Sequence, residues 1–205
     1  MPKQTFFNLN KEKRNKITTA AIDEFADKVY EQVNLSDVIK KAEIPRGSFY
    51  QYFNDKKDLY LHLLNLAKEK KMNYLNDSFY SKDLPFLELI EQLYSQGVQF
   101  AIDYPKFVRI FEKLLNNKNA IYDEVMKENL QFATRYYATC IDRDKSNNLI
   151  SKNIDTQTLA DLVGALTTNI TLEHINTNDL DNSYKLMKER FGHIIQILKK
   201  GIEEK

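Results

Sequence analysis

The chain has 205 residues, of which 42% are hydrophobic and 29% are charged, a composition typical of a globular protein rather than a disordered one. No apolar run reaches the roughly 18 residues of a membrane-spanning helix, and the basic start is not followed by an apolar segment of signal-peptide length, so we expect a cytoplasmic protein without a membrane partner. The net charge of +1 does not by itself indicate a nucleic-acid partner, and the single Cys140 excludes an internal disulfide.

The first predicted helix covers about residues 11–30. Its apolar residues recur at a four-residue spacing that places them on one helical face: Ile17, Ala21, Phe25 and Val29. Residues 1–16 hold five basic side chains and one acidic side chain, so any electrostatic attraction for phosphates is local and lies at this end of the chain.

Three further helices follow closely. Asn34 is a suitable N-cap for a short second helix, which buries Val38 and Ile39. A third short helix begins near Pro45. The long fourth helix begins after Asp55, whose carboxylate can cap it, and an acidic residue three positions later completes a variant of the capping box.

Prolines and polar caps divide the remainder of the chain into helices. Pro85 and Pro105 each stand where proline is tolerated in a first turn, and Asp155 is a suitable cap for a later helix. The last helix is expected to begin after Asp181 or Asn182. The pattern therefore predicts an all-α protein of about nine helices. We expect an N-terminal three-helix module at residues 1–54 and a larger helical domain at residues 55–205.

The third short helix, in the stretch IPRGSFYQYF, has two different faces. On a helical wheel Phe49 and Phe53 fall together and point inward. The small and polar residues Gly47, Ser48 and Gln51 fall on the opposite face, with Tyr50 and Tyr52 on the flanks. Two short helices joined by a tight turn, the second with a low polar face, are typical of a helix-turn-helix that enters the DNA major groove.

The side chains of this face match the hydrogen-bonding groups of base pairs. Arg46 can donate two hydrogen bonds to guanine, Gln51 can pair with adenine, and Tyr50 can pack on a thymine methyl group. Gly47 allows close approach of the backbone. Tyr52, Lys56 and Ser36 are expected beside the phosphates, where contacts position a protein without reading sequence. The predicted DNA-binding residues are Ser36, Arg46, Gly47, Ser48, Tyr50, Gln51, Tyr52 and Lys56. The alternative is a helical hairpin with ordinary exposed tyrosines.

Residues 17–64 resemble the N-terminal module of the tetracycline-repressor (TetR) family of bacterial transcription regulators. The matching segments are AAIDEFADKVY, LSDVIKKA, RGSFYQYF and DKKDLY. The resemblance implies a homodimer that binds double-stranded operator DNA, most often as a repressor, and a C-terminal domain that binds a small-molecule effector. It also implies that the last two long helices of each subunit form the dimer interface.

Two positions depart from the family pattern. Glu43 stands in the turn where family members usually carry glycine, so it must either adopt a left-handed backbone or bend the turn differently. Pro45 stands where Ser or Thr usually begins the recognition helix, which removes a side-chain cap.

Aromatic residues are concentrated between residues 94 and 137. We expect them to line an apolar pocket with a few hydroxyl groups that orient a small, apolar ligand. The candidate ligand-binding residues are Tyr94, Phe100, Phe107, Phe111, Tyr136 and Tyr137. The alternative is a helical core that contains many rings.

Catalysis has little support in the sequence. The three histidines are isolated, and the chain has no nucleophile elbow, phosphate loop or dinucleotide fingerprint. We therefore predict no catalytic residues, no metal site and no cofactor. The leading hypothesis is a ligand-responsive transcription regulator. The alternatives are a helical carrier or sensor of apolar ligands without a role in gene regulation and, with less support, an enzyme.

Overall fold

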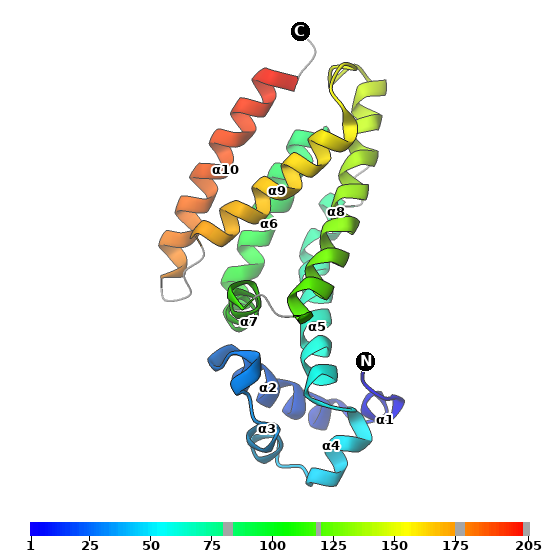
Figure 1. Cartoon of the computed structure of the whole chain (residues 1–205), viewed down its shortest axis with the longest axis vertical. Helices are drawn as coiled ribbons and strands as arrows, with labels where there is room; N and C mark the ends of the chain where they lie inside the picture. The colour runs from blue at the N-terminus through cyan, green and yellow to red at the C-terminus, as the bar shows by residue number, and fades with distance from the viewer. Residues whose placement is uncertain (80–83, 118–119, 175–178, 203–205) are drawn as a thin grey trace. The chain divides into compact units, whose positions relative to one another are not determined.

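The computed structural model describes residues 1–79, 84–117, 120–174 and 179–202. Within these residues the chain forms ten α-helices and one 3-10 helix (Figure 1). The α-helices are α1 (Gln4–Phe7), α2 (Lys11–Asp27), α3 (Leu35–Lys41), α4 (Arg46–Tyr52), α5 (Lys56–Phe79), α6 (Phe86–Asp103), α7 (Pro105–Asn116), α8 (Ala120–Ser146), α9 (Thr156–His174) and α10 (Leu180–Ile202), and the 3-10 helix η1 is Tyr30–Gln32. The predicted all-α fold is confirmed. The helix that the sequence did not predict is the short α1.

Local polar groups determine where several helices begin. Asn34 accepts a hydrogen bond from the Ser36 backbone N–H at 2.9 Å, as predicted for an N-cap. Asp55 Oδ1 accepts from the Asp58 N–H at 2.8 Å, and Asp155 Oδ1 accepts from the Thr158 N–H at 2.8 Å. These three predicted caps are confirmed. They could be predicted because each needs only neighbouring residues.

Two predicted helix boundaries are wrong. The first long helix ends at Asp27 rather than near residue 30, because Lys28 and Val29 adopt extended backbones before η1. The last helix begins at Leu180, and Asp179 Oδ1 accepts from the Asn182 N–H at 3.3 Å, so the expected start after residue 181 or 182 lies inside α10.

The helices form two compact units. The first contains Met1–Asn73 and Asp103–Asn117, and the second contains the described residues of 74–102 and 118–205. This division differs from the expected boundary after residue 54, because the first part of α5 packs into the first unit and α7 packs against α2. None of the described helices is long and apolar enough to cross a membrane.

The first unit has an aromatic and aliphatic core beneath α4. Its fully buried side chains come from α2, α4 and α5 and from the residue that follows α4, and include Ile17, Phe25, Phe49, Phe53, Leu59 and Leu63. α2 contacts both α3 and α7, and an ion pair of 2.6 Å joins Lys106 of α7 to Asp23 of α2. The apolar core and this pair fix the frame on which α3 and α4 are held.

The second unit is a helical body in which α9 packs against both α8 and α10 (Figure 1). Asp144, which is 1% exposed, accepts a hydrogen bond from the Phe86 N–H at 2.5 Å. Arg143 donates to the other oxygen of the same carboxylate from Nε at 2.8 Å and from Nη2 at 2.7 Å. This buried carboxylate therefore fixes the start of α6 to the end of α8.

Candidate nucleic-acid interface

The turn between α3 and α4 is a Schellman motif. The N–H of Glu43 donates to the C=O of Lys40 at 3.1 Å, and the N–H of Ile44 donates to the C=O of Ile39 at 3.3 Å. Glu43 has φ 51°, so it adopts the left-handed backbone that was one of the two expected alternatives. The buried side chains of Ile39 and Ile44 lie at the two ends of the motif. This turn ends α3 abruptly and allows α4 to leave in a new direction.

The inner face of α4 carries the two phenylalanines predicted to point inward. Phe49 and Phe53 are fully buried, and their ring centroids lie 5.4 Å apart in a stacked arrangement. Tyr52, expected on an exposed flank beside phosphate, is instead 5% exposed, with its ring 6.3 Å from that of Phe6. The N-terminal residues cover this flank and bury the ring, and the phosphate contact of Tyr52 stays a prediction.

The outer face of α4 is small, polar and uncovered within the described chain. Arg46, Gly47, Tyr50 and Gln51 are exposed, and Ser48 is half-buried. Gly47 does not have a positive φ, and no atom lies within 4 Å of the position that a Cβ would take there. Neither backbone conformation nor internal packing therefore requires glycine, although glycine destabilises a helix relative to alanine by about 0.5–1 kcal/mol. The structure therefore gives no internal reason for a glycine at this position.

Lys56 and Ser36, both expected beside phosphates, have different surroundings. The Lys56 ammonium donates to the carbonyl groups of Tyr30, Glu31 and Val33 at 2.8, 3.2 and 3.0 Å, and it lies 4.6 Å from the centroid of the Tyr30 ring. It therefore holds the loop that contains η1. Ser36 is exposed in the first turn of α3, so its side chain is accessible to a phosphate.

Residues 3–9, called the N-terminal arm below, contact α4 directly. Phe6 of this arm is 2% exposed, and its ring centroid lies 4.9 Å from that of Phe53. Lys3 donates hydrogen bonds to two carbonyl groups of α4. The sequence reasoning interpreted this segment only through its basic charge. The adjacent Phe6 and Phe7 were the available signal that part of it is buried.

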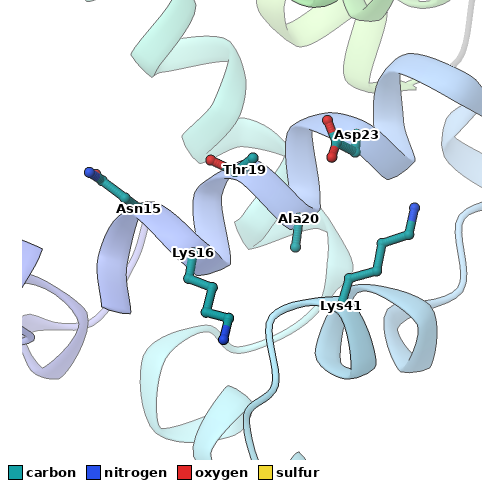
Figure 2. A pocket seen from close by; sticks show the side chains of 6 residues that line it. All are labelled: Asn15, Lys16, Thr19, Ala20, Asp23 and Lys41. Carbon is teal, nitrogen blue, oxygen red and sulfur yellow. The ribbon is translucent and has the colours of Figure 1, made fainter. Parts of the chain in front are cut away.

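A shallow hollow lies between α2 and α3 (Figure 2). Asn15, Lys16, Thr19, Ala20 and Asp23 of α2 line it together with Lys41 of α3. Its charged groups already have partners within the first unit, since Lys16 contacts Glu43, Lys41 contacts Glu24 at 2.5 Å, and Asp23 pairs with Lys106. The hollow therefore offers no unpaired charge for a ligand.

The six candidate ligand residues are distributed over both units. Phe107 and Phe111 belong to α7 in the first unit, and the other four belong to the second. The Tyr94 ring stacks on Phe191 of α10 with centroids 4.1 Å apart and planes 8° apart. The Tyr94 hydroxyl is buried and has no hydrogen-bond partner among the described residues, and burial raises its pKa.

The remaining three candidates occupy α6 and α8. Phe100 is buried with its ring 5.8 Å from that of Tyr74, and Tyr137 lies 5.8 Å from Phe86. Burial raises the pKa of Tyr136 to about 12. The rings of the four candidates in the second unit therefore contact one another or other rings of that unit, which fits the alternative of an aromatic core.

The comparisons with known proteins agree with this geometry. The family model described as "Bacterial regulatory proteins, tetR family" matches residues 17–63, which contain α3, the Schellman turn and α4. A crystal structure of a TetR family transcriptional regulator from Chloroflexus aurantiacus covers 100% of both chains with 27% sequence identity and a TM-score of 0.71. The chain is therefore similar to a TetR family regulator over its whole length, and the family model matches its N-terminal module.

Two curated proteins from Staphylococcus aureus are also similar. A protein from strain Newman, named as the biofilm operon icaADBC HTH-type negative transcriptional regulator IcaR, is 30% identical over 91 residues, which cover 40% of this chain and 49% of the relative. The HTH-type transcriptional regulator QacR from strain Mu50 is 24% identical over 142 residues, which cover 69% of this chain and 65% of the relative. The chain thus spans about half the length of the first of these relatives. Their names describe regulators, in agreement with the prediction that this protein is not an enzyme.

Proposed function

We propose that the protein is a DNA-binding transcriptional regulator that binds operator DNA through α4, acts as a homodimer, and responds to a small-molecule ligand. The observation that carries the proposal is the outer face of α4. Neither backbone conformation nor packing within the chain requires a glycine at Gly47, and Arg46 and Gln51 are exposed beside it. A face of this kind lets a helix backbone lie close to base edges while the flanking side chains donate hydrogen bonds.

The test is selection and titration of DNA. The protein is used to enrich duplexes from a randomised pool, and the enriched duplex is titrated at two salt concentrations. Specific binding that weakens steeply with salt supports the proposal, because phosphate contacts release counterions. Arg46→Ala and Gln51→Ala are each expected to reduce operator affinity by about 1–3 kcal/mol. A pool from which no sequence is enriched would contradict the proposed function and favour a carrier or sensor.

The homodimer is supported by apolar side chains on the outside of the last two helices. Leu162 of α9 and both Leu186 and Ile197 of α10 are exposed, and Ile197 has an exposed fraction of 69%. Leu186 and Ile197 are eleven residues apart, which places them on one face of α10. Exposed apolar side chains that share a helix face are suited to association with a second copy. The relatives' names do not state an oligomeric state, so this part is tested separately below.

Ligand response is supported by the Tyr94 hydroxyl, which is buried without a hydrogen-bond partner in the described part of the chain. An unpaired buried hydroxyl is unfavourable by about 1–3 kcal/mol, and a polar atom of an otherwise apolar ligand would satisfy it. Native mass spectrometry of the purified protein tests for a co-purified small molecule. If apolar compounds change neither the melting temperature nor the DNA affinity, ligand response is refuted while DNA binding stands.

Repression is the direction that we propose for the regulator. One relative is named as a negative transcriptional regulator. A reporter gene placed behind the enriched duplex is expected to give lower expression when the protein is present. Higher expression would identify an activator instead.

A further inference from the structure

The C-terminal end of α4 is completed by residues far away in the sequence. An α-helix leaves its last four carbonyl groups without partners inside the helix. In α4 the first of these four, the C=O of Phe49, accepts a hydrogen bond from the N–H of Phe53 at 2.9 Å. The other three are each reached by the N-terminal arm: Lys3 Nζ donates to Tyr50 O at 2.8 Å, Thr5 Oγ1 donates to Gln51 O, and Lys3 N donates to Tyr52 O at 2.8 Å.

The arm is held in this position by the burial of Phe6. Its ring centroid lies 4.9 Å from Phe53, 5.2 Å from His62 and 6.3 Å from Tyr52. Burying a phenylalanine side chain contributes about 1.5–3 kcal/mol, which offsets part of the conformational entropy that the segment loses. The three hydrogen bonds therefore come from an anchored segment rather than from a loose tail.

α4 itself has few local means of fixing its position. It has seven residues, and its N-cap, Pro45, provides no side-chain hydrogen bond. Helices this short depend on tertiary contacts for their stability. The carbonyl groups that the arm holds include those of Tyr50 and Gln51, whose side chains are exposed on the proposed DNA-reading face. The arm thus holds the backbone of the same residues whose side chains would meet the bases.

We propose that the N-terminal arm positions the recognition helix α4 for sequence-specific DNA binding, with Lys3 and Thr5 as positioning residues and Phe6 as their anchor. This inference rests on the proposed DNA-binding function. It assigns the arm a role in discriminating between DNA sequences, beyond the general attraction of its basic Lys3 for phosphate.

Thr5→Val is the sharpest test, because it removes the hydroxyl donor and preserves charge and approximate shape. Thr5→Ser, which keeps the donor, is the matched control. Dissociation constants are measured for the enriched duplex and for a scrambled duplex of the same length at one salt concentration. Thr5→Val is expected to bind the enriched duplex about threefold to tenfold more weakly, the size of one net hydrogen bond. Its affinity for the scrambled duplex and both affinities of Thr5→Ser are expected to match those of the unmodified protein.

A uniform loss on both duplexes, or no loss on either, would overturn the positioning role. A second measurement does not need DNA. In Phe6→Ala, peptides covering α4 are expected to exchange their amide hydrogens faster, while peptides covering α9 remain unchanged. Unchanged exchange in α4 would refute the arm contact even if the protein binds DNA. If the unmodified protein enriches no duplex, the proposed function is refuted. The hydrogen-exchange experiment would still test whether the arm stabilises α4.

Discussion

Lys16 of α2 forms an ion pair with Glu43, the residue with a left-handed backbone that ends α3. Both side chains are substantially exposed, with exposed fractions of 45% and 73%. Exposed pairs of this kind contribute about 0–1 kcal/mol. The left-handed backbone costs a residue with a side chain about 1–2 kcal/mol relative to glycine. The pair therefore offsets only part of the cost of a conformation that the turn imposes on Glu43.

Glu43→Gly is expected to be more stable than Glu43→Ala by about 1 kcal/mol in the free energy of unfolding, because both lose the ion pair and only glycine relieves the left-handed strain. Urea denaturation of the two variants measures the difference. Equal stability would mean that the turn does not hold residue 43 in this conformation in solution.

Gly47→Ala should separate stability from function. We expect the free energy of unfolding to rise by about 0.5–1 kcal/mol, because a Cβ at this helical position meets no atom within 4 Å. We also expect weaker binding to the enriched duplex, because the Cβ would stand between the α4 backbone and the base edges. Gly192→Ala in α10, where a Cβ likewise meets nothing within 4 Å, is the control. It should gain similar stability with unchanged DNA affinity. Undiminished binding by Gly47→Ala would count against close approach.

Glu24 links α2 to α3 and should make the protein sensitive to acid. Its carboxylate is 4% exposed and accepts from Lys28 at 2.8 Å and contacts Lys41 at 2.5 Å. Hydrogen bonds from Lys28 and Lys41 lower the pKa of Glu24 below its ordinary value of 4.5. Because the folded-state pKa lies below the unfolded value, this stabilisation is present above about pH 4.5 and is lost as the pH falls through the folded-state pKa.

The variant Glu24→Gln is accordingly expected to lose about 2 kcal/mol of unfolding free energy at pH 7, the size of hydrogen bonds to charged groups. Its stability should also fall less steeply than that of the unmodified protein below pH 4.5. Glu12→Gln, at an exposed position in the first turn of α2, is the matched control. Parallel pH profiles for the unmodified protein and Glu24→Gln would rule out this contribution.

Lys56→Met should destabilise the fold rather than act only on DNA binding. The ammonium of Lys56 donates to three backbone carbonyl groups, and its removal is expected to lower the free energy of unfolding by about 1.5–3 kcal/mol. Lys40→Met, at an exposed position in the last turn of α3, should change stability by less than about 0.5 kcal/mol. If thermal unfolding shows the two variants to be equally stable, the carbonyl contacts of Lys56 contribute little.

If the protein dimerises through α10, a charge placed on the exposed apolar face of this helix should disrupt the dimer. Ile197→Asp places a carboxylate in the proposed interface, so we expect it to convert the dimer to a monomer in sedimentation velocity experiments. Leu149→Asp, at an exposed leucine between α8 and α9, should remain dimeric. If the unmodified protein sediments as a monomer across the micromolar range, the dimer proposal is incorrect.

The features that could be predicted from sequence are those set by neighbouring residues. The caps Asn34, Asp55 and Asp155 act within three residues, and the inward pair Phe49 and Phe53 follows from helical periodicity alone. These local rules were sufficient for most of the described helices and for the outer face of α4, but not for α1 or for the end of α2 and the start of α10.

The features that the sequence did not reveal depend on contacts between distant residues. Tyr52 is buried because Phe6, 46 positions earlier in the chain, covers its flank. Lys56 lies at the start of α5, where the sequence suggested a phosphate contact, but the loop around η1 brings three carbonyl groups to it. Periodicity gives the angle of a side chain around its own helix and does not identify the segment that will cover it.

The packing of α7 on α2 has a consequence for how the protein can be divided. The backbone passes between the two units three times, after Asn73, after Ile102 and after Asn117, so the first unit is assembled from two separate stretches of chain. A fragment that stops at Asn73 would lack α7, expose the face of α2 that α7 covers, and deprive Asp23 of Lys106. The helix-turn-helix is therefore contiguous in sequence, but the unit that supports it is not a cleavable N-terminal piece.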